Sequence, residues 1–71
     1  MTNKQELKAV MTLFGDRQID LAAELKISPP TLSNKINGKT FFTTFEIEKI
    51  AKRYKLSQKD IPRIFFTRQV N

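Results

Sequence analysis

The sequence contains no cysteine and no histidine, and only two of its 71 residues are glycine. Without cysteine the chain cannot form disulfides or thiolate metal sites, and without histidine it lacks the usual zinc ligand and catalytic base. The acidic residues show no pairing typical of acid–base catalysis, and no glycine-rich phosphate-binding loop is present. We therefore expect no cofactor, no metal, no small-molecule substrate and no enzymatic activity.

Long apolar runs are also missing. No stretch approaches the ~20 apolar residues that cross a membrane, and the first residues, MTNKQELK, lack the apolar segment of a signal peptide. A chain without cysteine fits a reducing cytoplasm. We expect a cytoplasmic bacterial or phage protein, with no membrane partner.

The length of the chain predicts a single domain over residues 1–71, with a core from about 5 to 66 and a tail from 67 to 71. A chain this short buries only about 60% of its extended surface, so its stability is modest. The net charge of +6 is uneven, because residues 1–27 are neutral overall and residues 28–71 carry the whole excess. A basic half favours a polyanionic partner, although basic small domains also arise for solubility alone.

Apolar residues recur at helical spacing along most of the chain, which predicts an all-α fold of five short helices around one core. The stripes are Leu7, Val10, Met11 and Phe14 in a first helix; Leu21, Ala22 and Leu25 in a second, from about Arg17 to Leu25; Leu32 and Ile36 in a third, from about Pro29 to Ile36; Ile47, Ile50, Ala51 and Tyr54 in a fourth; and Ile61, Ile64 and Phe65 in a short fifth. The final FFTRQVN is aromatic and β-branched, and predicts a short strand or a tail.

Local patterns mark where these helices begin and end. Asparagine and glycine tolerate the left-handed conformation that closes a helix, and Ser or Thr with an acidic residue three positions later favours a helix start. The stops are Gly15-Asp16 and Asn37-Gly38, and the starts are Thr43 with Glu46 and Ser57 with Asp60. Pro62 limits the fifth helix to one or two turns, because proline inside a helix removes a hydrogen bond.

Two adjacent prolines stand in the segment ISPPTLSNKINGK, where the third helix is expected to begin. Ser28 is a good N-cap residue, and Pro29 suits the first helical position because its N–H would have no partner inside the helix. Pro30 is tolerated at the second position for the same reason. The prolines therefore start the helix and do not interrupt it.

Residues 18–39 read QIDLAAELKISPPTLSNKINGK, in which a Q-x-x-L-A-x-x-L pattern is followed by a three-residue turn, Thr-Leu-Ser and a closing Asn-Gly-Lys. The small Ala22 lets a second helix approach closely. This ordered set resembles the helix-turn-helix domain of temperate-phage repressor and Cro proteins, over about residues 5 to 57. The resemblance implies a lambda repressor-like fold whose 29–36 helix enters the major groove of DNA.

The resemblance also assigns roles to individual residues. Free N–H groups at the start of the 29–36 helix, with Lys35 and Lys39 nearby, are expected to favour phosphate. The residues that would contact bases are Ser28, Pro29, Pro30, Thr31, Ser33 and Asn34. The residues that would contact the DNA backbone are Gln18, Lys35, Asn37, Lys39 and Thr40.

The sequence departs from the family pattern at two places. The family often has glutamine where Pro29 and Pro30 stand, and proline rings offer only apolar contact with thymine methyls. The turn often uses glycine where this chain has Lys26, and a left-handed lysine would cost roughly 1–2 kcal/mol.

Two functions from different classes follow. The first is a Cro-like transcriptional regulator that binds a partly symmetric double-stranded operator as a homodimer, because one helix contacts too few base pairs for discrimination. The second is an antirepressor or modulator of repression, in which the Pro29-Pro30 surface docks onto a phage repressor protein. An excision or replication accessory that binds DNA is a third possibility.

Three further features have alternative interpretations. The cluster of Phe41, Phe42 and Phe45 is either a stacking platform for single-stranded nucleic acid or, as we expect, has at least two members packed on the core or an adjoining subunit. The basic series Lys49, Lys52, Arg53 and Lys55 is either a solvated helix face or a phosphate contact. The apolar C-terminal residues Phe65, Phe66 and Val70 either cover the core or form a dimer surface.

Overall fold

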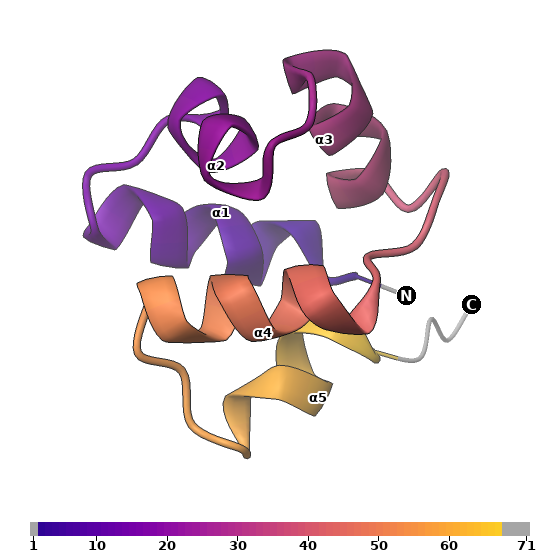
Figure 1. Cartoon of the computed structure of the whole chain (residues 1–71). Coiled ribbons are helices and arrows are strands. Elements are labelled where there is room, and N and C mark those ends of the chain that lie inside the picture. The colour runs from indigo at the N-terminus through magenta and orange to yellow at the C-terminus, as the bar shows by residue number, and fades with distance from the viewer. Residues whose placement is uncertain (1, 68–71) are drawn as a thin grey trace.

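The computed structural model describes residues 2–67 and contains five α-helices in that range (Figure 1). The helices are α1 (Lys4–Leu13), α2 (Gln18–Leu25), α3 (Pro29–Ile36), α4 (Thr44–Arg53) and α5 (Asp60–Phe65). The all-α prediction is confirmed, and residues 2–67 contain no strand. Most of the segment predicted as a strand or tail, including Val70, lies outside the described residues.

The helices form a middle layer with further helices on its two sides. In Figure 1, α2 and α3 lie together on one side, α1 and α4 cross the middle, and α5 closes the other side. The backbone N–H of Asn3 donates to the carbonyl of Ile64 at 2.6 Å, which ties the start of α1 to α5. None of the helices in residues 2–67 has the length and hydrophobicity that crossing a membrane requires.

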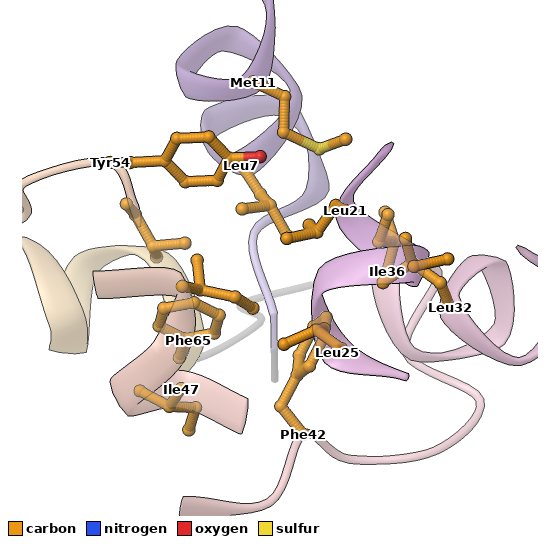
Figure 2. Close-up of a cluster of buried hydrophobic side chains, with 13 residues drawn as sticks. Leu7, Met11, Leu21, Leu25, Leu32, Ile36, Phe42, Ile47, Tyr54 and Phe65 are labelled. Carbon is orange, nitrogen blue, oxygen red and sulfur yellow. The ribbon is translucent and has the colours of Figure 1, made fainter. Parts of the chain in front are cut away.

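A single hydrophobic core draws side chains from all five helices and from the segment between α3 and α4 (Figure 2). Its largest fully buried members are Leu7, Leu21, Leu32, Ile36, Ile50 and Ile64. The helical stripes predicted from the sequence therefore face inward, with one exception. Phe14 is 44% exposed at the end of α1, where its ring lies 5.3 Å from that of Tyr54.

The phenylalanine cluster divides differently from the prediction. Phe42 is buried and its ring meets that of Phe65 edge-to-face at 5.5 Å, whereas Phe41 and Phe45 are exposed. Within the chain only one of the three packs on the core, so the expectation of two is not met there. Helical periodicity predicts which side chains are buried only within a helix. These three residues precede α4 or lie in its first turn, where the periodicity makes no prediction.

The expected helix starts are confirmed for α3 and α4. The Ser28 hydroxyl accepts the N–H of Thr31, and the Thr43 hydroxyl accepts the N–H of Glu46. Helix α5 differs slightly, since it begins at Asp60 and not directly after Ser57. These two side chains nevertheless bond to each other at 3.0 Å.

Two side-chain clusters join distant parts of the chain. Arg53 on α4 forms a two-pronged pair with Asp16, at 2.6 and 2.9 Å, and also reaches Glu24 on α2 at 3.1 Å. The Tyr54 hydroxyl donates to Asp16 at 2.7 Å. The Arg53 hydrogen bonds lower the pKa of Asp16 despite its burial. Part of the basic series on α4 thus serves the fold, because Lys49 also pairs with Glu24 at 3.7 Å.

Candidate nucleic-acid interface

Helix α3 presents one continuous exposed face, because its opposite face is anchored on α2. Leu32 and Ile36 are fully buried in the core beside Leu21 and Leu25 of α2. Five of the six residues predicted to contact bases are consequently exposed at the start and outer side of α3, and Ser33 is half-buried. The exposed five are Ser28, Pro29, Pro30, Thr31 and Asn34.

The turn between α2 and α3 comprises residues 26–28 and begins with Lys26, whose backbone is strained. Lys26 adopts φ 58° and ψ 40°, the left-handed conformation considered from the sequence, and its N–H bonds back to carbonyls of α2. The side chain is exposed. A non-glycine residue there costs roughly 1–2 kcal/mol; on either side of it, Leu25 is buried and Ile27 packs against the core.

The start of α3 is chemically closed, contrary to the expectation of free N–H groups there. Pro29 and Pro30 have no N–H, and the next two N–H groups, of Thr31 and Leu32, both bond to Ser28. The hydroxyls of Ser28 and Thr31 also bond to each other at 2.8 Å. The first turn of α3, residues 29–32, therefore has no spare backbone donor for a phosphate.

Asn34 is the best-placed polar group on the exposed face. Among residues 2–67 its carboxamide makes no hydrogen bond, so its donor and its acceptor are both free. Ser33 is less available, because its hydroxyl accepts from the Asn37 carboxamide at 3.3 Å. Of the six candidates for base contact, Asn34 alone offers the paired donor and acceptor that adenine requires.

Backbone hydrogen bonds cap the end of α3, and the lysine that follows has no ion-pair partner among the described residues. The carbonyl of Asn34 accepts the N–H of Lys39 at 2.9 Å and of Thr40 at 3.4 Å, while Gly38 takes φ 83°. This turn places the side chains of Lys39 and Thr40 in solvent beside α3. Lys39 has no ion-pair partner within residues 2–67.

Lys35 is the one predicted DNA-backbone residue that the structure places elsewhere. Its side chain is only 12% exposed, its ammonium lies 2.8 Å from Oε1 of Glu46, and it also donates to the carbonyl of Phe41 at 3.1 Å. Burial raises the pKa of Glu46, but the hydrogen bonds from Lys35 and Thr43 outweigh it and leave that pKa below its ordinary value. Lys35 is therefore engaged within the fold, and its ammonium is not free in the way that the assignment to phosphate expected.

The start of α2 has the free donors that α3 lacks. The N–H groups of Gln18 and Ile19 have no acceptor among the described residues, and the half-buried Gln18 side chain is also without a hydrogen bond there. Arg17, which the sequence analysis did not select, is exposed beside them and pairs with Asp20 at 3.2 Å. An arginine directly before the glutamine assigned to phosphate was the signal in the sequence that could have selected Arg17 as a further phosphate contact.

Unpaired charge in residues 2–67 is almost entirely lysine. Every acidic side chain except Glu48 forms an ion pair, and so does each arginine of this range. The lysines outside such pairs are Lys4, Lys8, Lys26, Lys39, Lys52, Lys55 and Lys59. Lys55 and Lys59 lie in the connection from α4 to α5, which Figure 1 places far from α3, so these two do not join the α3 face.

Phe65 and Phe66, proposed with Val70 as a dimer surface, lie in different environments at the end of α5. Phe65 is buried in the core, and Phe66 is exposed. Of these two residues, Phe65 therefore belongs to the core and Phe66 is left as a candidate for a surface contact.

A scan against models of protein families matches none of them, and a search of the curated proteins gives no match.

Proposed function

We propose that the protein binds double-stranded DNA through α3, as a Cro-like transcriptional regulator of a temperate phage. The observation that carries the proposal is the exposed face of α3, where the unpartnered carboxamide of Asn34 lies between the helix start and the free Lys39. In this proposal α2, the turn at residues 26–28 and α3 act as a helix-turn-helix, and α3 lies in the major groove.

Each part of the interface then has a separate chemical role. Asn34 pairs with the N6 and N7 edge of an adenine, and the rings of Pro29 and Pro30 contact thymine methyls. Phosphates are held by Lys39 on one side and by the free N–H groups of Gln18 and Ile19 on the other. Arg17 can join them, because a solvent-exposed pair such as Arg17–Asp20 is worth little and exchanges readily.

The test is a titration of the purified protein against random duplex DNA and against the intergenic DNA beside its own gene, at about 50 and 200 mM salt. The proposal expects binding that weakens steeply with salt and prefers the intergenic DNA. Weak binding without preference at either salt contradicts it.

The variant Asn34→Ala is expected to weaken binding to the operator about 10- to 100-fold, since one two-pronged base contact is worth roughly 1–3 kcal/mol. Binding to random DNA should change less than about twofold. Fluorescence anisotropy on both duplexes measures this. Gln58→Ala is the matched control, because it removes an exposed amide far from α3. Equal losses on both duplexes would remove Asn34 from the base-contacting set.

The variant Lys39→Ala is expected to weaken binding to every duplex and to reduce the slope of log K against log salt by about one. Lys59→Ala, an equally unpaired lysine between α4 and α5, should leave that slope unchanged. If the two variants behave alike, the contribution of Lys39 is only its general charge.

A second function is favoured by the closed start of α3. Two rigid proline rings without a free N–H form a surface suited to another protein, and the arginines of residues 2–67 are all engaged in ion pairs. In this alternative the same face of α3 docks onto a phage repressor and prevents its action. Size-exclusion chromatography with the cognate repressor tests it, and two separate peaks would count against the alternative.

A further inference from the structure

An uncharged aromatic surface lies beside the segment that follows α3. Its residues, here called the aromatic face, line a hollow of about 270 Å³. They are Thr2, Phe41, Phe42, Ile47, Phe65 and Phe66. Three of them are buried, but Phe41 is 80% exposed and Phe66 is 62% exposed. Two large apolar rings in solvent beside an apolar hollow are costly for a chain that stays alone.

The backbone at the exposed Phe41 is held in place by the largely buried ion pair of Lys35 and Glu46. Its carbonyl accepts from Lys35, whose ammonium is fixed by Glu46 in the same cluster. Glu46 in turn accepts the N–H of Thr43 at 2.8 Å, which fixes the other end of the segment. The backbone that carries the Phe41 ring is therefore ordered in advance, and binding through this ring loses little conformational entropy.

The face combines a protruding ring with a hollow, and none of its residues carries a charge. A cavity of about 150 Å³ is enough to bind benzene, so the hollow has room for a phenylalanine ring. None of its six residues is ionisable, and a chain of net charge +6 can meet its own copy closely only where such charges are absent. A protruding ring next to a hollow on one surface is what a two-fold symmetric contact requires.

We propose that the aromatic face binds the same face of a second copy of this chain, with Phe41 of each copy entering the hollow of the other. Phe66 borders the contact, and Phe42 with Phe65 forms its floor. The dimer itself stands independently of DNA binding; only its purpose rests on the proposed function. That purpose is a second α3, because one helix contacts too few base pairs to select a site. Phe41 follows Lys39 by two residues, so this contact adjoins the DNA surface.

The size of the face predicts a weak dimer. A buried phenylalanine contributes about 150–250 Å², so the two exposed rings supply on the order of 300 Å² per copy. A standard interface buries about 800 Å² per partner, so concentrations up to about 1 mM are needed to observe it. Because two basic chains repel each other, added salt should strengthen the dimer, whereas it weakens binding to DNA.

Sedimentation equilibrium of the full chain without DNA, from about 10 μM to 1 mM and at low and high salt, tests the proposal. We expect a monomer–dimer equilibrium that salt strengthens. Phe41→Ser should raise the dimer dissociation constant about 30-fold, as loss of a central aromatic residue does, and Phe66→Ser should raise it less. Phe45→Ser is the control, since Phe45 is 66% exposed but lies outside the face; it should change the constant less than about twofold. Circular dichroism checks that each variant folds.

Several results would overturn the proposal. One is a wild-type chain that stays monomeric up to the highest concentration. Another is an equal effect of Phe45→Ser and Phe41→Ser. If the rest of the chain covers the face, the wild type is monomeric and Phe41→Ser lowers the melting temperature equally at every concentration. A dimer without DNA binding would sustain this inference and defeat the proposed function, and a monomer that selects the intergenic DNA would do the reverse.

Discussion

The variant Leu32→Ala is expected to lower the free energy of unfolding by about 2–5 kcal/mol, the range for removing a fully buried leucine. Leu32 is fully buried and joins α3 to the core beside α2. A domain of this length has roughly 4–10 kcal/mol in total, so the variant should be partly unfolded at moderate temperature. Urea unfolding followed by circular dichroism measures the change.

Leu13→Ala is the matched control for this loss, because Leu13 is an exposed leucine at the end of α1. Its cost should stay below about 0.5 kcal/mol, as for most surface substitutions. A loss below about 1 kcal/mol for Leu32→Ala would mean that α3 does not depend on this contact for its position.

The variant Glu46→Ala is expected to cost about 3–5 kcal/mol, because it leaves a nearly buried ammonium without its partner. The side chains of Lys35 and Glu46 are only 12% and 10% exposed, and Glu46 also accepts the N–H of Thr43. Glu48→Ala is the control on the same helix, where the carboxylate is exposed; there the cost should be below about 0.5 kcal/mol. Urea unfolding again supplies the values.

A double variant separates charge from packing at this site. Lys35→Met with Glu46→Leu removes both charges and should be more stable than Glu46→Ala alone, since an apolar pair of similar volume often replaces a buried ion pair without loss. If the double variant is the less stable of the two, the hydrogen bond of the Lys35 ammonium to the Phe41 carbonyl, which Glu46→Ala keeps, is what matters.

The same pair gives stability a defined pH dependence. The pKa of Glu46 is lower in the folded chain than its ordinary value, because the bonds from Lys35 and Thr43 exceed the effect of burial. The folded state thus holds the proton less tightly than the unfolded state does. The contribution of Glu46 is present at neutral pH, above the ordinary pKa of a glutamate, and should be lost as the pH falls through the lower pKa of the folded state. Glu46→Ala should flatten that part of the profile.

Much of the fold was predictable because it depends on neighbours in the sequence. Apolar residues three and four positions apart must share a helix face, and this decided that Leu7 and Met11 point inward. The N-caps Ser28 and Thr43 were equally local, since a hydroxyl reaches only the N–H groups of the next turn. The exposed face of α3 follows from the same periodicity, once Leu32 is known to be buried.

The candidate site was harder to predict, because its chemistry depends on contacts between distant residues. Lys35 and Lys39 look alike in the sequence. Lys35 nevertheless forms an ion pair with Glu46, which lies eleven residues further along the chain, whereas Lys39 is in solvent. The closed start of α3 also became evident only when the N–H groups were counted against their acceptors.

The sequence by itself determined the five helices, the starts of α3 and α4 and most of the apolar faces that the helices bury, because each depends on interactions within one or two helical turns. Only the tertiary structure decided which lysine is free and which phenylalanine is exposed. Phe41 and Phe42 are adjacent and chemically identical. Phe41 is exposed and Phe42 is buried because of where the chain between α3 and α4 crosses the core. No local pattern contains that information, since it arises from packing five helices against one another.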